Sequence, residues 1–224
     1  MGKLNFGKSI KKETVFEIAY RELKSAILSN ELDYNQYYTE ADFAQVLGIS
    51  RTPVREAVQA LVYDRLLEAV PRKGLIVRSF SESEISQIFL LRKAIEKEIL
   101  MVYMKAVTKK QIETLKQILS DQKETIPNQD RDSFIQLDQK FHIQIIHDTN
   151  YHLVEEFFMR LHDLTVLIGH QVIRKKGRMN EVIAEHEAII HAMEKRDVDA
   201  VQNQMLKHLD NTMKSYNSMD SNKN

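Results

Sequence analysis

Ile49-Ser-Arg-Thr-Pro-Val-Arg-Glu-Ala57 is the stretch that decides the fold of the first part of this chain. It follows an amphipathic segment, Thr39–Leu47, and a single glycine, Gly48. A helix, a tight glycine turn and a second helix have the spacing of a helix-turn-helix. The second helix begins with short hydroxyls and guanidinium groups, which are side chains that contact DNA bases and phosphates.

The segments on either side extend this pair of helices to a winged helix-turn-helix. Apolar residues keep helical spacing before the pair, and Thr39-Glu-Ala-Asp42 has the form of a capping box. Pro71-Arg-Lys-Gly74 separates two strand-like runs and predicts a hairpin turn. We expect a flexible tail at 1–11 and this domain at 12–79. Its predicted elements are helices near 12–29, 39–47 and 50–64 and strands at 67–70 and 75–78.

From Ser81 onward the chain shows only helical patterns. Ser81-Glu-Ser-Glu84 and Thr108-Lys-Lys-Gln111 are both capping boxes. We expect an all-helical bundle at 80–217 and a disordered polar end at 218–224. The predicted fold class is therefore mostly α, a winged helix-turn-helix followed by a helical bundle. The predicted helices of the bundle lie near 82–106, 109–124, 130–149, 151–176, 179–195 and 198–217.

Composition excludes several classes of protein. The 224 residues are 43% hydrophobic, enough for a full core. There is no Cys, which excludes disulfides and thiolate metal sites and fits a cytoplasmic protein. No run approaches the roughly 18 apolar residues of a membrane helix, so no membrane partner is expected. Residues 1–80 carry 12 Lys/Arg against 10 Asp/Glu, an excess too small to indicate nucleic-acid binding by itself.

Seven residues of the winged domain are candidates for contacting DNA. Arg51 and Arg55 are four apart and project from one helix face, and an Arg can bind O6 and N7 of guanine. Ser50 or Thr52 is expected to cap the helix, with Pro53 in its first turn. Residue types alone equally allow an ordinary helical hairpin with solvated arginines. The DNA-binding set is Ser50, Arg51, Thr52, Arg55 and, at the hairpin tip, Arg72, Lys73 and Gly74.

Residues 12–78 resemble the GntR family of bacterial transcription regulators, and Ser50–Ala57 carries the most specific match. The family usually has Pro-Gly before its second helix, where this chain has Asp33–Tyr38. Some members carry a DNA-contacting Arg where Ala41 stands here. These departures bear on the operator sequence and not on DNA binding. The resemblance implies operator contacts at the positions of Ser50, Arg51, Thr52, Arg55 and Gly74.

A second group of polar residues lies in the C-terminal half. Asp138 and His142 are four apart on an apolar helix face, and His186 and His208 lie on two other predicted helices. Three helices can bring such groups onto one ion. One carboxylate and three imidazoles suit divalent Zn, Ni, Mn or Fe. From spacing alone, an Asp138–His142 hydrogen bond with two core histidines is favoured over a metal site.

Residues 81–217 resemble the FCD effector domain of the FadR subfamily of GntR regulators. Six predicted helices suggest its shorter, VanR-like group. Metal-binding members use an Asp and three His at matching positions, so the resemblance implies a divalent metal ion as cofactor. The matching residues are Leu91–Glu96, Asp138–His142, Glu185-His186 and His208.

The same resemblance points to residues that bind an effector. The family's Arg at the position of Arg92 often faces the effector cavity, so Arg92 is the first candidate to bind a carboxylate. Its alternative role is a surface ion pair with Glu96, four residues along the helix. Arg160 is a weaker second candidate.

These features predict a ligand-responsive transcription factor, a repressor and not an enzyme. Its expected partners are double-stranded operator DNA of palindromic sequence, a second copy of itself as a homodimer, and a small carboxylate effector. Two alternatives stay open. A non-haem metalloenzyme would use the His and carboxylate ligands but leaves the winged helix unexplained. A DNA-binding module without a small-molecule ligand would have a closed, apolar bundle.

Overall fold

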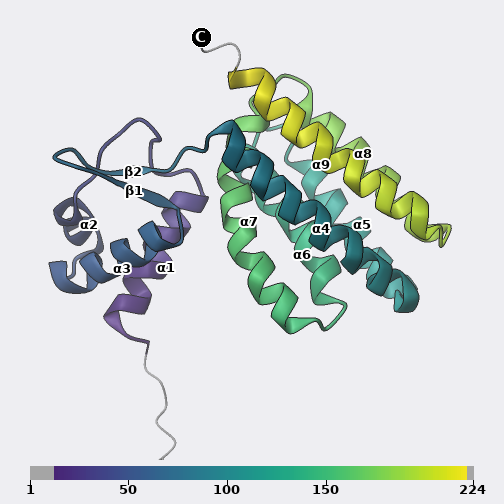
Figure 1. Cartoon of the computed structure of the whole chain (residues 1–224), viewed down its shortest axis with the longest axis horizontal. Coiled ribbons are helices and arrows are strands. Elements are labelled where there is room, and N and C mark those ends of the chain that lie inside the picture. The colour runs from purple at the N-terminus through teal and green to yellow at the C-terminus, as the bar shows by residue number, and fades with distance from the viewer. Residues whose placement is uncertain (1–12, 221–224) are drawn as a thin grey trace, which may run out of the picture. The chain divides into compact units, whose positions relative to one another are not determined.

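The computed structural model describes residues 13–220, and the chain divides into two compact units between Arg78 and Ser79. The predicted tail at 1–11 and the end at 221–224 lie outside the described residues. The first unit contains α1 (Val15–Leu28), α2 (Glu40–Leu47), α3 (Arg51–Tyr63), β1 (Leu67–Val70) and β2 (Gly74–Val77) (Figure 1). The second contains α4 (Glu82–Ala106), α5 (Lys109–Glu124), α6 (Arg131–His147), α7 (His152–Val172), α8 (Arg178–Glu194) and α9 (Val198–Asp220).

The helix-turn-helix forms for local reasons. Thr39 caps α2, and Asp42 returns a hydrogen bond to the Thr39 backbone, so the capping box is present. Gly48 ends α2 with φ 66°, a left-handed conformation that glycine adopts without a Cβ penalty. The chain then enters α3, which packs against α1 through buried side chains such as Leu23 and Leu61. This packing fixes α3 as the second helix of the motif.

The wing is a two-stranded antiparallel hairpin that pairs Leu67 with Val77 and Val70 with Gly74. Its second strand begins at Gly74, one residue before the predicted start, because Gly74 already pairs across the hairpin. Leu75 also exchanges backbone hydrogen bonds of 2.8 Å with Tyr38. A Cβ on Gly74 would lie 2.5 Å from the Tyr38 carbonyl oxygen, and φ there is 115°. The base of the wing is thus tied to the segment that precedes α2.

The second unit is an all-helical bundle in which α4 packs against α6, α7 and α9. Ser81 and Thr108 form the predicted capping boxes of α4 and α5. Two helix ends of the bundle differ from prediction by three residues or more. The helix predicted at 151–176 ends at Val172, because a turn follows that reaches Gly177 at φ 85°. The last helix continues to Asp220, so 218–220 are helical and do not belong to the disordered end predicted from the sequence.

The interior of the bundle holds a band of polar side chains among its apolar ones. Arginine, glutamate, glutamine and histidine side chains are buried there although charged groups are rarely buried without partners. No described helix of either unit is long and apolar enough to cross a membrane. The buried polar side chains that bear on function are Arg92, Glu96, Gln122, Gln139, His142, Arg178, His186 and His208.

Candidate metal centre, effector cavity and DNA-binding surface

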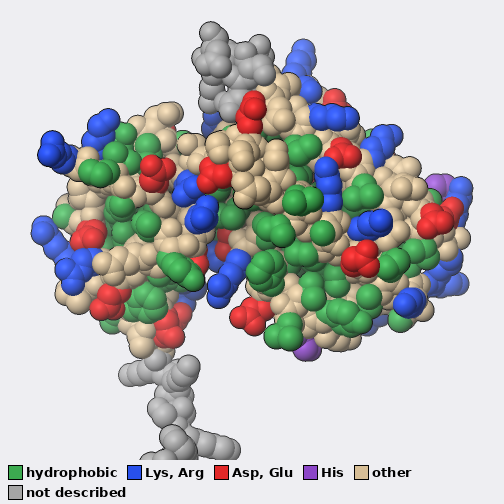
Figure 2. All heavy atoms as spheres, in the orientation of Figure 1, with side chains coloured by type: hydrophobic (Ala, Val, Ile, Leu, Met, Phe, Trp, Pro, Cys, Tyr) green, Lys and Arg blue, Asp and Glu red, His purple; other side chains and the backbone are tan. Residues whose placement is uncertain are grey.

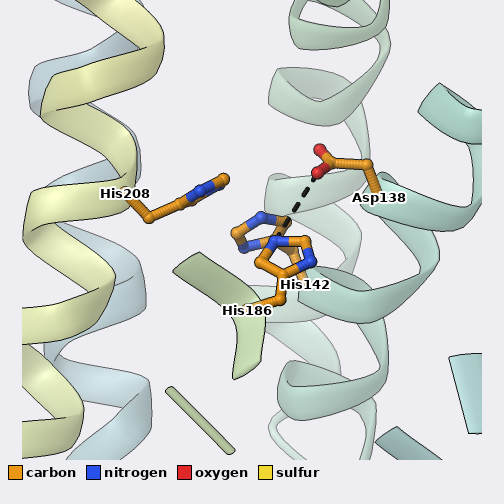
Figure 3. Close-up of side chains that lie close together, drawn as sticks. All are labelled: Asp138, His142, His186 and His208. Atoms are coloured by element: carbon orange, nitrogen blue, oxygen red, sulfur yellow. Dashed lines mark ion pairs between the residues drawn. The ribbon is translucent and has the colours of Figure 1, made fainter. Parts of the chain in front are cut away.

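Four predicted metal ligands converge inside the bundle, as Figure 3 shows. Asp138 and His142 come from α6, His186 from α8 and His208 from α9. One potential ligand atom from each lies within 4.8 Å of all the others. The three imidazoles are almost fully buried, and His186 Nε2 is 3.5 Å from an Asp138 carboxylate oxygen. The predicted hydrogen bond between Asp138 and His142 is not what organises this cluster.

Each imidazole is held through its Nδ1 atom by a residue from another helix. His142 Nδ1 is 2.6 Å from Glu96 on α4, and His208 Nδ1 is 2.7 Å from Glu185 on α8. His186 Nδ1 is 3.2 Å from the side-chain oxygen of Gln122 on α5. With these acceptors the proton is assigned to Nδ1, which leaves the Nε2 lone pair free. Carboxylate or amide support of this kind orients metal-binding histidines.

Electrostatics keep two of the imidazoles, His142 and His186, neutral and the Glu96 carboxylate charged. Burial lowers the pKa of His142 and outweighs the opposing effect of Glu96. Burial also lowers the pKa of His186, and the neighbouring His208 and His142 add to the effect. Burial would raise the pKa of Glu96, but Arg92 and His142 outweigh it and lower that pKa to about 2. Neutral imidazoles are the form that binds metal ions.

The residues present fit a divalent metal ion. The Nε2 atoms of His142 and His186 are buried and have no hydrogen-bond partner among the described residues. An unpaired buried nitrogen costs free energy that coordination of an ion removes. Three imidazole nitrogens and one carboxylate oxygen suit Zn(II), Ni(II), Mn(II) or Fe(II). The alternative considered from the sequence is that these are core histidines with satisfied hydrogen bonds. That alternative requires partners for the two Nε2 atoms, and the described residues provide none.

A small cavity of ≈ 30 Å³ adjoins the cluster. The candidate ligands Asp138 and His208 line it, and so does the predicted effector residue Arg92. Arg92 is buried, so its ion pair with Glu96, 2.7 Å long, is an internal one and not the surface pair considered from sequence. Other lining residues include Phe89, Phe134, Gln139, Thr165, Val172, Arg178 and Thr212.

The structure places the second effector candidate, Arg160, away from this cavity. Arg160 is exposed on α7 and does not line the cavity. Arg178, the first residue of α8, lines it instead and is 1% exposed. Its guanidinium donates to both carboxylate oxygens of Glu185, at 2.8 and 2.9 Å, and to Thr212.

Sequence reasoning missed Gln122 and Arg178. Gln122 ends the buried face of α5 after Ile118 and Leu119, so a polar residue in an apolar stripe was the available signal. Arg178 follows Gly177, which comes directly after the basic run Arg174-Lys-Lys176. Such a sequence is typical of a solvated turn. Only the packing of α8 shows that one of these cations is buried.

The predicted DNA-binding residues lie on the surface of the first unit. Ser50, Arg51, Thr52 and Arg55 are exposed at the start of α3, and Arg72 and Lys73 are exposed at the wing tip. Arg51, Arg72 and Gly74 line one open groove with the start of α2. One cation of α3, Arg51, and one of the wing, Arg72, therefore face a common groove.

The expected helix cap at this surface is wrong. Ser50 occupies the N-cap position of α3, but its side chain makes no capping hydrogen bond, and Thr52 lies inside the helix. The third helical residue is Pro53, which has no backbone N–H for a cap to bind. The Ser50 hydroxyl is consequently not engaged by its own helix.

Comparison with known protein families covers both units. Residues 17–77 match the bacterial regulatory proteins of the gntR family, and residues 87–211 match the FCD domain. This chain is a GntR-family regulator with an FCD domain. Members of the family bind DNA, and FCD domains bind small-molecule effectors and commonly a metal.

Relatives of this GntR regulator are themselves described as transcriptional regulators. The chain is 26% identical over 190 residues to the transcriptional repressor RspR of Escherichia coli, covering 85% of this chain and 83% of that protein. It is 25% identical over 192 residues to the gluconate operon transcriptional repressor of Bacillus subtilis, covering 84% and 78%. The family is one of regulators, so the metalloenzyme alternative is set aside.

Solved structures with the same fold agree with the two-unit architecture of this GntR regulator. Escherichia coli McbR/YncC matches with a TM-score of 0.79 at 18% identity, covering 92% of this chain and 98% of that one. A putative GntR regulator from Rhodococcus matches with a TM-score of 0.78 at 19% identity, covering 91% and 97%. The mostly helical fold class predicted from sequence is confirmed.

Proposed function

We propose that this protein is a ligand-responsive transcriptional repressor that binds a palindromic operator as a homodimer. Its helical domain holds a divalent metal ion and senses a small carboxylate. The observation that carries the proposal is the arrangement of three buried imidazoles, each supported at Nδ1 by Glu96, Gln122 or Glu185. Relatives named as repressors support the direction of regulation.

The metal centre and the effector cavity are contiguous, which supports a role for both in sensing. Asp138 and His208 belong to the ligand cluster and also line the cavity. A bound ion would act as a Lewis acid with open positions for a carboxylate. The buried guanidinium of Arg92 is placed to bind the same carboxylate in a region where water does not screen it.

DNA binding belongs to α3 and the wing. Arg51 and Arg55 would enter the major groove, where a guanidinium reads guanine, and Arg72 and Lys73 would contact the backbone. A palindromic operator needs two such helices, about one helical turn of DNA or a multiple apart. The effector can shift DNA binding only by its differential affinity for the two states of the dimer.

A second copy of the chain is proposed to cover an apolar face of α4 and α7. These helices are in contact, and each exposes large apolar side chains, some visible in Figure 2. On α7, Leu153 is 84% exposed and Phe157 is 58% exposed, four residues apart on one face. On α4, the exposed apolar residues are Leu90, Leu91 and Met101. An apolar face of this kind, on a protein that must present two recognition helices, fits a homodimer interface.

The test is elemental analysis of purified, untagged protein together with its His186→Ala variant. About one metal ion per chain is expected for the native protein, and a clear loss for the variant, with operator binding by the metal-free protein retained. His191→Ala is the matched control, because His191 lies on the same helix but is exposed. A fully metal-loaded His186→Ala protein would remove the four-ligand site from the proposal.

A further inference from the structure

Two buried guanidinium groups on the cavity wall each keep one nitrogen without a partner. Arg92 Nη2 and Arg178 Nε are buried and have no hydrogen-bond acceptor among the described residues. Both side chains line the same cavity, with Arg92 on α4 and Arg178 at the start of α8. A buried donor without an acceptor is costly, so a group that supplies an acceptor here binds favourably.

Other nitrogens of the same side chains donate to neighbouring residues, so both guanidinium groups are held in place. Arg92 Nε donates to Glu96 at 2.7 Å. Arg178 donates to Glu185 through both terminal nitrogens and to Thr212 at 2.9 Å. A ligand therefore meets two fixed donors, one from each helix, and does not have to order them. Preorganised donors favour a ligand that carries two separate acceptor groups.

Charge limits what those two groups can be. Glu96 neutralises Arg92, and Glu185 neutralises Arg178, because each pair is in direct contact. Glu181 also contacts Arg178, at 3.2 Å, but its side chain is 53% exposed, so water screens its charge. The Asp138 carboxylate then leaves a divalent ion with one net positive charge. A monoanion balances this charge, whereas a dianion leaves a buried negative charge without a counterpart.

We propose that Arg178 is a second effector-binding residue and that the effector is a short hydroxy- or keto-monocarboxylate. Arg92 binds the carboxylate of the effector, and Arg178 donates a hydrogen bond to its neutral hydroxyl or keto oxygen. The proposal rests on the sensing function proposed above and specifies the ligand of that same cavity. The cavity is small, ≈ 30 Å³, so it favours a short acid over a long one.

The test is calorimetric titration of the zinc-loaded, full-length protein with matched sets of acids. The three-carbon set is propanoate, lactate and malonate, and the four-carbon set is butanoate, 2-hydroxybutanoate and succinate. Within at least one set the hydroxy acid should bind roughly ten-fold or more tightly than the plain acid, since it satisfies the second donor. It should also bind more tightly than the diacid.

Arg178→Lys separates a ligand contact from a structural role. A lysine keeps the positive charge beside Glu185 but lacks the Nε–H group. The variant should lose most of the preference for the hydroxy acid while its affinity for the plain acid and its zinc content stay the same. Arg160→Lys, at an exposed position on α7, is the control and should keep the preference.

Three results overturn the inference. They are a plain acid or a diacid that binds most tightly in both sets, the absence of binding by all six acids, and an unchanged preference in Arg178→Lys. Zinc content and operator binding are measured on the same preparations. If those two properties hold while the acid ranking fails, only the ligand class is wrong, whereas their loss counts against the proposed function itself.

Discussion

At the scale of single residues, the buried polar side chains form connected chains that end at the imidazoles. Arg92 contacts Glu96, and Glu96 contacts His142; Arg178 contacts Glu185, and Glu185 contacts His208. Each carboxylate thus has a guanidinium on one side and an imidazole on the other. This pairing makes charged groups tolerable in the interior and fixes the direction of two ring nitrogens.

The paired carboxylates should make the metal-free protein sensitive to acid. Opposing charges lower the pKa of Glu96 and of Glu185 to about 2, against an ordinary value of 4.5. The unfolded chain therefore takes up protons first as pH falls. The stability these groups contribute is complete above about pH 4.5 and is lost as pH falls toward 2. Urea unfolding of the metal-free protein between pH 2 and 6 measures this, and Glu96→Gln should flatten the dependence. If the free energy of unfolding changed equally with pH in the native protein and in Glu96→Gln, the prediction would be contradicted.

Arg55 should contribute to operator recognition through its guanidinium. It is exposed near the start of α3, one turn from Arg51. Arg55→Ala is expected to reduce operator affinity by about 1–3 kcal/mol if the side chain reads a base. Fluorescence anisotropy with a labelled operator measures the change, and metal content should not alter. Arg131→Ala, at an exposed position on α6 outside the DNA-binding unit, serves as the matched control. Native affinity for the Arg55 variant would remove this residue from the recognition set.

At the scale of elements, local sequence signals determine where several helices begin, whereas a tertiary contact holds the wing in position. Capping boxes at Thr39, Ser81 and Thr108 start three helices where the sequence predicts them. The wing differs, because its second strand is also bound to Tyr38 from before α2. That contact demands glycine at position 74 for close backbone approach as well as for φ.

Two glycines separate these effects. Gly48→Ala should destabilise the first unit by about 1 kcal/mol, because φ is positive there but the space for a Cβ is open. Gly74→Ala should cost more, about 3 kcal/mol, because the Cβ also meets the Tyr38 carbonyl. Native-state hydrogen exchange at the Leu75 amide, which donates to Tyr38, measures the opening of the wing. Similar exchange in both variants would show that the clash relaxes at little cost.

At the scale of the whole molecule, a single chain leaves large apolar side chains of α4 and α7 exposed to water. Leu153 and Phe157 would remain in water in a monomer, at a cost set by their apolar area. Covering them with a second copy would bring two winged domains into one particle.

If the proposed dimer forms through this face, Phe157→Glu should convert it to a monomer and weaken binding to a palindromic operator. Sedimentation equilibrium gives the mass of the particle, and anisotropy gives the affinity. Thr114→Glu adds the same charge at an exposed position on α5 and should leave both unchanged. A dimeric Phe157→Glu protein would place the interface elsewhere.

The sequence by itself determined the winged helix-turn-helix and the count of helices in the bundle. These features depend on short-range rules: apolar periodicity, capping residues and a glycine turn act within a few residues of each other. The identity of Asp138, His142, His186 and His208 as candidates also came from the sequence, with the resemblance supplying what spacing left open. Their convergence within 4.8 Å is a property of three packed helices.

Only the tertiary structure decided which polar residues surround that cluster. Arg160 and Arg178 are both helical arginines in the sequence, yet packing exposes one and buries the other. Gln122 and Glu185 reach the imidazoles from other helices, at sequence separations of 64 and 23 residues. No local pattern encodes such contacts, because the free energy that favours them arises when helices distant in the sequence exclude water between them.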